Sequence, residues 1–175
     1  MLRIRVSTNP PGRPHADAPI LSADLELADH IYPIAFLIDT GADHTVVDAL
    51  TARMQADVMS KGIREKIKGV GGKWPVRRFR DVATILTLAR DESEKEVPIR
   101  ISLPTLDVMA PFAQFKGDDV LEILHPVAPS DRRLSGHSPR IRRVENVVPL
   151  LGRDVFKASR MKLDWDPNGD SWLYL

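Results

Sequence analysis

The sequence predicts a mainly β domain with one or two short helices. Fourteen prolines and ten glycines divide the 175 residues into short apolar segments, and few windows hold a helical period for long. Several segments alternate between apolar and polar residues, which is typical of a strand with one buried face. Near the C-terminus, Asp166-Pro-Asn-Gly-Asp170 is a strong hairpin signal. These observations favour strands joined by turns.

Most of the expected strands lie before residue 90. Leu2–Val6 alternates, and the segment Asn9–Pro14 that follows is expected to be a loop because proline removes backbone donors. A helix is expected between Thr45 and Met59, where apolar residues recur at roughly helical spacing. The other strands expected in this part are Ile20–Leu27, Ile34–Ile38, Ile63–Ile67, Val76–Phe79 and Val82–Leu88.

Residues 91–140 differ in composition from the rest of the chain. They begin with the charged run Asp91–Glu96 and contain nearly half of the prolines, so we expect an insertion of loops and short elements within one domain that spans the chain. After this insertion, Leu150–Ser159 is expected to form a second helix. Met161–Trp165 and Trp172–Leu175 are expected to pair as strands of the C-terminal hairpin.

Composition excludes several functional classes. A formal net charge of +1 argues against a protein whose main task is nonspecific nucleic-acid binding. Because cysteine is absent and the five histidines show no ligand spacing, we expect no disulfide, thiol nucleophile, metal site or cofactor. The longest apolar runs are far shorter than a membrane span, and the N-terminus lacks the apolar stretch of a signal peptide. A cytoplasmic protein without a membrane partner is expected.

The segment Phe36–Val47 carries the most chemical information. An apolar run ends at Asp39, and Thr40-Gly41 then turn the backbone. A carboxylate beside a buried strand is costly unless hydrogen bonds or a shared proton compensate it. The N–H group of Gly41 can approach such a carboxylate closely, and the Thr40 hydroxyl offers a second polar contact. By itself, Asp-Thr-Gly is also an ordinary turn after a strand.

Two further segments accompany this turn. Ile67–Trp74 contains a glycine-rich hairpin tip, Gly69-Val-Gly-Gly72, and Val147–Phe156 contains Leu-Leu-Gly-Arg-Asp. The three segments, in this order, resemble the motifs of the retropepsin-like aspartic proteases. Leu37–Ala42 matches the catalytic motif of that family, Gly69–Gly72 the tip of its flap, and Leu150–Asp154 its last conserved segment.

The resemblance implies an aspartic endopeptidase that acts as a C2 homodimer. The chain holds a single Asp-Thr-Gly, so the second catalytic carboxylate must come from the Asp39 of another copy. Two carboxylates held close together share one proton, and aspartic proteases are the standard example. The ionised one then activates water, and the protonated one polarises the scissile carbonyl. Thr40 is expected to hydrogen-bond across the two-fold axis.

The resemblance also assigns supporting roles. Arg153 is expected to form an ion pair with Asp43, although an exposed cation at a helix end is the alternative, and Gly152 is expected to support the same loop. The terminal strands Leu2–Val6 and Trp172–Leu175 are expected at the dimer interface. The residues expected to bind an extended peptide substrate are Gly41, Ala42, Asp43, Gly69, Val70, Gly71 and Gly72.

Two alternatives come from other classes of protein. The first is a catalytically silent member of the fold that dimerises or binds peptides, with Asp39 kept as a hydrogen-bond centre. The second is a nucleic-acid-binding protein that uses residues 61–80, where eight Lys and Arg residues oppose only Glu65. A solvated hairpin edge is the simpler interpretation of this basic segment, and an acidic peptide or another anionic partner is the other.

Overall fold

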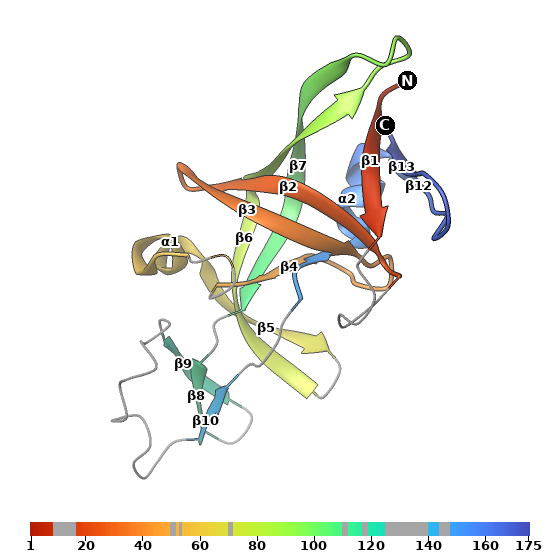
Figure 1. The fold of residues 1–175 in the computed structure, drawn as a ribbon. Helices are drawn as coiled ribbons and strands as arrows, with labels where there is room; N and C mark the ends of the chain where they lie inside the picture. Colours follow the sequence, from red (N-terminus) through yellow and green to blue (C-terminus); the bar gives the residue numbers. More distant parts are fainter. Residues whose placement is uncertain are drawn as a thin grey trace. The chain divides into compact units, whose positions relative to one another are not determined.

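The mainly β class is confirmed by the computed structural model of the chain. The structure describes residues 1–8, 17–49, 52, 54–69, 72–109, 112–116, 119–124, 140–143 and 148–175. Strands predominate among these residues (Figure 1). The two helices are short and span Ala56–Lys61 (α1) and Arg153–Ser159 (α2). Within the described part, neither helix has the length and apolarity that crossing a bilayer requires.

The first of two compact units carries the Asp39 segment. It comprises Met1–Val46, Arg80–Leu106 and Val148–Leu175. Parts of β4 (Thr45–Asp48), β6 (Gly72–Arg90) and β7 (Glu96–Met109) belong to it. Its remaining strands are β1 (Arg3–Thr8), β2 (Pro19–Leu27), β3 (His30–Ile38), β11 (Leu150–Leu151), β12 (Lys162–Asp164) and β13 (Ser171–Tyr174).

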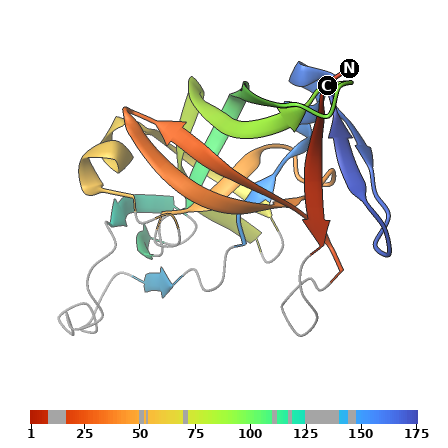
Figure 2. The same ribbon diagram turned by 45° about the horizontal axis from the view of Figure 1, so that its top comes forward.

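A continuous series of hydrogen-bonded strands runs through this unit in the order β12-β13-β1-β2-β3-β11. The strands β2 and β3 form a twisted antiparallel hairpin, visible in Figure 2, whose last pair is Leu27↔His30. The turn between them places Ala28 and Asp29 at φ values of 51° and 66°, the left-handed conformation that tight hairpins need. The register of the hairpin is therefore fixed by its turn.

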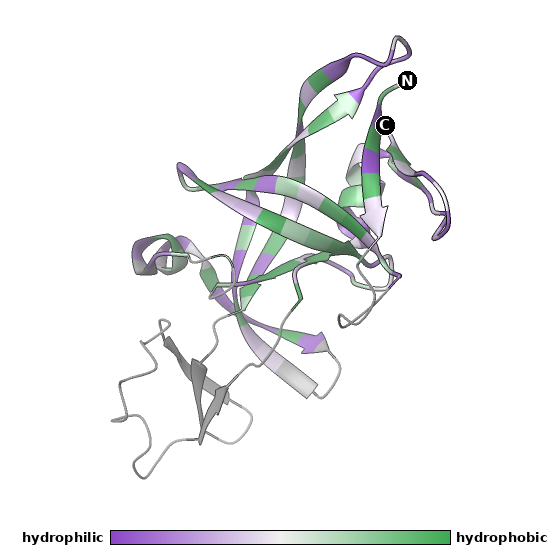
Figure 3. Cartoon of the chain, viewed as in Figure 1, coloured by the Kyte–Doolittle hydropathy of each residue, from purple (hydrophilic) through white to green (hydrophobic). Residues whose placement is uncertain are grey.

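Alternation along the strands builds the core of the unit. Ile4 and Val6 are buried, whereas Arg5 between them is exposed. Leu21 and Leu25 of β2 are almost fully buried as well. Figure 3 shows the same alternation as hydrophobic and hydrophilic bands along β1. Each such aliphatic side chain contributes about 1.5–3 kcal/mol by leaving water, so the alternating pattern determines which face of each strand points inward.

The second unit comprises Val47–Phe79 and Asp107–Val147. It contains α1 and the hairpin of β5 (Ile63–Gly69) with the first part of β6, which closes at the pair Gly69↔Gly72. A separate small sheet has the strand order β10-β8-β9. Its strands span Phe112–Lys116 (β8), Asp119–Leu124 (β9) and Arg140–Arg143 (β10).

The C-terminal hairpin is confirmed, with the pairing Leu163↔Leu173 at its centre. The expected helix between Thr45 and Met59 is wrong in its first part, because Thr45–Asp48 is the strand β4 and α1 begins only at Ala56. Val46 and Val47 are both buried although they are adjacent. A strand buried on both faces loses the simple period of two, and its apolar run then resembles a helical pattern.

Three other boundaries differ from those expected. Val76–Phe79 and Val82–Leu88 belong to one long strand, β6, rather than to two. The strand β11 occupies the beginning of the expected helix Leu150–Ser159, and α2 starts at Arg153. Residues 96–109 form the long strand β7 instead of a loop, so the predicted insertion of loops is wrong there. The loop expected over 9–14 lies outside the described residues.

Candidate active site

Asp39 follows directly on a deeply buried strand end. Phe36, Leu37 and Ile38 of β3 are at most 8% exposed, whereas Asp39 itself is half-buried. Its backbone N–H donates to the Leu151 carbonyl over 3.1 Å. Because β11 runs parallel to β3, with Leu151 opposite Ile38, the sheet holds the backbone that leads up to the Asp39 side chain.

The turn after Asp39 brings two N–H groups back to this residue. The Gly41 N–H donates to Asp39 Oδ1 over 2.8 Å, and the Ala42 N–H donates to the Asp39 carbonyl over 3.1 Å. A Cβ atom at position 41 would lie 3.0 Å from Oδ1, which is closer than real Cβ contacts normally are. Glycine therefore allows the backbone donor to approach the carboxylate, as the sequence predicts. Thr40 is exposed.

The third motif packs directly against this turn. The Arg153 N–H donates to the Ala42 carbonyl over 2.9 Å, and the Gly152 N–H donates to Thr45 Oγ1 over 3.2 Å. A Cβ atom at position 152 would lie 2.4 Å from the carbonyl carbon and oxygen of His44. Two segments more than a hundred residues apart in sequence thus form one closely packed cluster around Asp39.

Arg153 forms the ion pair with Asp43 that the resemblance implies. Both side chains are well exposed, at 50% and 67% of their area, so water screens much of the attraction and the pair adds little to stability. Its effect is geometric. Together with the backbone hydrogen bond from Arg153 to Ala42, it fixes the loop against the first turn of α2.

A histidine–aspartate pair beside this loop was not predicted from the sequence. His44 Nδ1 lies 3.8 Å from Asp154 Oδ2, and the Asp154 side chain is 12% exposed. Within the described part of the chain, neither Asp154 oxygen has a hydrogen-bond partner at normal geometry, although backbone N–H groups lie near the carboxylate. Burial raises the pKa of Asp154 above its usual value, and this effect exceeds the opposing influence of His44 and of nearby backbone N–H groups.

The glycine-rich hairpin belongs to the second unit. Gly69 ends β5 and Gly72 begins β6, so the expected hairpin between these strands is confirmed. Val70 and Gly71, which the resemblance assigns to substrate binding, lie outside the described residues. On β5 the side chains of Arg64, Lys66 and Lys68 are exposed.

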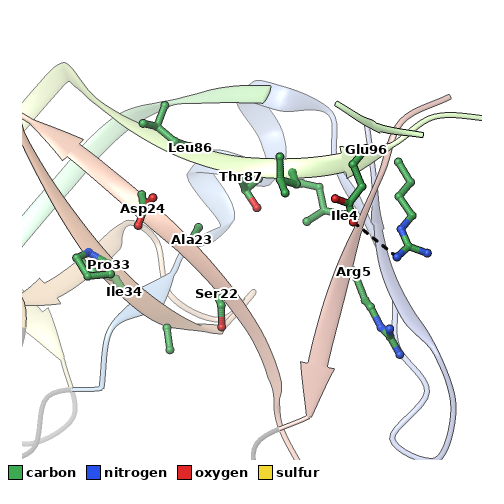
Figure 4. Close-up of a pocket in the computed structure, with 13 residues that line it drawn as sticks. Ile4, Arg5, Ser22, Ala23, Asp24, Pro33, Ile34, Leu86, Thr87 and Glu96 are labelled. Carbon is green, nitrogen blue, oxygen red and sulfur yellow. Dashed lines mark ion pairs between the residues drawn. The ribbon is translucent and has the colours of Figure 1, made fainter. Parts of the chain in front are cut away.

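A pocket of the first unit is separate from the Asp39 loop. It measures about 660 Å³, and its lining includes Ser22, Asp24 and Thr87 but no residue of the Asp39–Asp43 turn (Figure 4). Along β2, the pairing with β1 ends at Ser7↔Ile20, and the pairing with β6 begins at Asp24↔Leu86. The pocket lies where β2 changes from one partner strand to the other. Asp39 therefore does not line this pocket.

Comparison with known proteins adds no assignment to this geometry. No family model matches the sequence, and a search of curated proteins finds no significant match. Within the described residues, no three His, Asp or Glu side chains are grouped so that they could hold a metal ion.

Proposed function

We propose that the protein is an aspartic endopeptidase of the retropepsin-like type, active as a homodimer. The observation that carries this proposal is the Asp39 cluster. A carboxylate at the end of a buried strand accepts the N–H of Gly41, and the segment Leu151–Arg153 packs against the same turn. A mere surface turn would not need this second segment. A carboxylate fixed in this way supports a role in proton transfer, which needs a positioned acid or base.

The reaction needs two such carboxylates. In the proposed dimer, the Asp39 side chains of the two copies meet at the two-fold axis and share one proton, because two adjacent negative charges repel each other. The ionised carboxylate takes a proton from water, the resulting hydroxide attacks the scissile carbonyl, and the protonated carboxylate donates to the carbonyl oxygen. The exposed Thr40 is available for the contact across the axis.

The proposed substrate is an extended peptide. Gly41, Ala42 and Asp43 offer backbone and side-chain groups beside Asp39, and recognition of a peptide backbone in this manner resembles the addition of a strand to a sheet. The family resemblance also assigns the hairpin tip Gly69–Gly72 to substrate binding. No cofactor takes part in this reaction.

Replacement of the carboxylate tests the proposal directly. Incubation of the wild type and of Asp39→Asn with a diverse peptide library, followed by mass spectrometry, should show cleavage only with the wild type. The amide is nearly isosteric but cannot act as a base, so the rate should fall at least about a hundredfold. Asp29→Asn is the matched control. Asp29 lies in the β2–β3 turn at a φ of 66°, a conformation that asparagine tolerates well.

The possible outcomes of this experiment distinguish the candidate functions from one another. Cleavage by the wild type and Asp29→Asn but not by Asp39→Asn supports the protease. Equal cleavage by all three proteins would reject Asp39 as the catalytic group. Binding of peptides by the wild type without any cleavage would instead favour the catalytically silent peptide-binding module.

A further inference from the structure

Three strands of the first unit, β1, β2 and β6, separate from one another around the pocket described above (Figure 4). They leave a three-sided gap in the sheet, whose corners are the residue pairs Ser7↔Ile20, Asp24↔Leu86 and Arg3↔Arg90. Neighbouring corners are four residues apart along each strand, so each side of the gap is about 13 Å long. No strand in the described part of the chain fills it.

The backbone groups at the middle of each side point into this gap. The tight two-residue turn of the β2–β3 hairpin makes its closing pair a hydrogen-bonded one. Consecutive residues of a strand direct their N–H and C=O groups to opposite edges, so Ser22 directs its groups away from β3 and into the gap. The same alternation, followed through the corner pairs, directs the groups of Arg5 and Leu88 into it as well.

These backbone groups border open space. The pocket has a volume of about 660 Å³, and its lining includes Arg5, Ser22 and Leu88. This volume lies within the range of about 300–1,000 Å³ that is usual for ligand sites. Unpaired donors and acceptors along strand edges are a template for another backbone, and an extended peptide offers both kinds of group in the same alternation. The gap is therefore suited to about three residues of an extended chain.

The side chains on the outward face beside the gap are largely apolar. Asp24 of β2 lies between Pro33 of β3 and Leu86 of β6 in the sheet, and directly opposed residues point to the same face. Leu88, two residues after Leu86, shares this face and is 54% exposed. All four residues line the pocket. They offer a surface on which the aliphatic part of a long side chain can pack.

The charges that line the pocket favour a cationic ligand. Arg5 Nη2 lies 3.0 Å from Asp170 Oδ1. Arg90 Nη2 lies 3.8 Å from Glu96 Oε1, the ion pair drawn as a dashed line in Figure 4. Among the charged residues of the pocket, only the exposed Asp24 has no ion-pair partner in the described part of the chain. Its carboxylate is therefore available to a positively charged group.

We propose that this gap binds an extended segment of a partner protein that carries a lysine or an arginine. The backbone of the segment pairs with the N–H and C=O groups of Ser22 and Leu88. Its basic side chain lies along Pro33 and Leu86 and places its cationic end at the Asp24 carboxylate. None of these residues belongs to the Asp39 cluster, so such binding does not require peptide cleavage.

Titration with a short basic peptide tests the backbone pairing. The probe is the acetylated and amidated pentapeptide Ser-Val-Lys-Val-Ser, added to isotopically labelled protein. The backbone amide signals of Arg5, Ser22 and Leu88 should shift in heteronuclear NMR spectra as the peptide binds. An analogue with N-methyl groups on its three central residues keeps the charge but loses three donors. It should bind at least about tenfold more weakly, because the backbone groups of the gap then lack partners.

Reversal of the charge at Asp24 tests the recognition of the basic side chain. A peptide with norleucine in place of lysine keeps the aliphatic chain without the charge, and it should bind the wild type at least about threefold more weakly. Asp24→Lys should weaken binding of the lysine peptide at least about tenfold. The same variant should instead bind a peptide with glutamate in place of lysine. Asp29→Asn, in the β2–β3 turn outside the pocket, is the matched control.

The results distinguish this site from the candidate active site. Amide shifts at the gap that Asp24→Lys abolishes and the glutamate peptide restores would support the proposal, whether or not the protein cleaves peptides. Equal affinity of the wild type for the lysine, norleucine and N-methylated peptides would overturn it. A wild type whose gap amides do not respond to millimolar peptide would overturn it as well. Shifts confined to the Asp39 turn would also reject the site, since the peptide would then bind only where the substrate is proposed to bind.

Discussion

Gly152 shows how one missing side chain can hold two distant segments together. Its Cα packs on the backbone of His44, and a Cβ atom would come within 2.4 Å of the His44 carbonyl. Backbone atoms cannot rotate out of the way as the end of a flexible side chain can. The glycine of the third motif is therefore a packing requirement of the Asp39 loop, which the sequence motif alone does not reveal.

Gly152→Ala should consequently destabilise the protein and reduce peptide cleavage together. The loop or the start of α2 must shift to admit the methyl group, and overpacking of this kind costs about 1–3 kcal/mol. Urea unfolding and kcat/KM would measure the two effects. Ala158 is an exposed residue of α2, and Ala158→Ser adds one atom there without a backbone clash. This control variant should change the free energy of unfolding and kcat/KM much less than Gly152→Ala does. Wild-type stability in Gly152→Ala would contradict the close packing.

Asp154 should make the stability of the protein depend on pH. Burial raises the pKa of its carboxyl in the folded state, so the folded protein holds a proton that the unfolded chain releases at lower pH. The free energy of unfolding should therefore fall as the pH rises from the unfolded pKa, near 3.8, through the raised folded value. The groups that face Asp154 are His44, from the Asp39 loop, and the backbone N–H groups of Thr105 and Val155.

Asp154→Asn should remove this loss, because the amide carries no charge to bury. Relative to the wild type, the variant should gain stability as the pH rises above 4. Urea unfolding at several pH values from 4 to 8 would measure the difference, with Asp43→Asn, an exposed neighbour, as the control. Parallel stability curves for the wild type and Asp154→Asn would show that burial of this carboxyl does not govern its ionisation.

The hairpin of β5 and β6 is anchored in the second unit by a buried ion pair. Arg78 donates from Nε and Nη2 to the two oxygens of Asp107 over 2.7 and 2.8 Å, and Asp107 is fully buried. Glu65 accepts from the remaining nitrogen of Arg78. Hydrogen bonding to Asp107 is the main reason why the pKa of Arg78 is raised. The base of the hairpin therefore has a defined connection to the end of β7.

Arg78→Met should destabilise the protein by about 3–5 kcal/mol, because it leaves the Asp107 carboxylate buried without a partner. Glu65→Gln removes only the charge of the half-buried second carboxylate that contacts Arg78. It should lower the free energy of unfolding by less than about 1 kcal/mol. Chemical denaturation of both variants would test the ranking. Equal losses would indicate that Asp107 is not the dominant partner of Arg78.

The elements differ in how well the sequence predicts them. The hairpin β12–β13 was predictable because Asp166–Asp170 specifies its turn locally, and Asp39–Gly41 because its motif is local as well. β7 was missed although Ile99, Ile101 and Leu103 alternate, since the prolines nearby suggested loops. The contact between His44 and Asp154 depends on two segments more than a hundred residues apart meeting in space, and no local pattern encodes it.

At the scale of the whole molecule, the proposed reaction depends on two copies of one chain. Wild-type protein mixed with Asp39→Asn should therefore lose more activity than dilution alone would cause. At equal amounts of the two chains, only about a quarter of the dimers carry two aspartates at the axis. Activity per wild-type chain should fall to about half once subunits have exchanged.

Fluorogenic cleavage of one identified peptide, at concentrations well above the dimer dissociation constant, would measure this loss. Mixing with Asp29→Asn in place of Asp39→Asn is the control and should not reduce the activity. Activity that stays proportional to the amount of wild-type chain alone would show that one Asp39 is sufficient. The two-carboxylate mechanism would then be rejected.

The N- and C-terminal ends of the first unit lie side by side in both views (Figure 1, Figure 2), joined by the hydrogen bond from Leu175 to Leu2. The two ends are therefore close enough to be joined by a short linker. A short glycine linker from Leu175 to Met1 could connect them covalently, and new ends could be opened in the exposed turn at Ser93–Glu94. We expect such a permuted chain to keep the strand pairings described above, and circular dichroism and urea unfolding would test this.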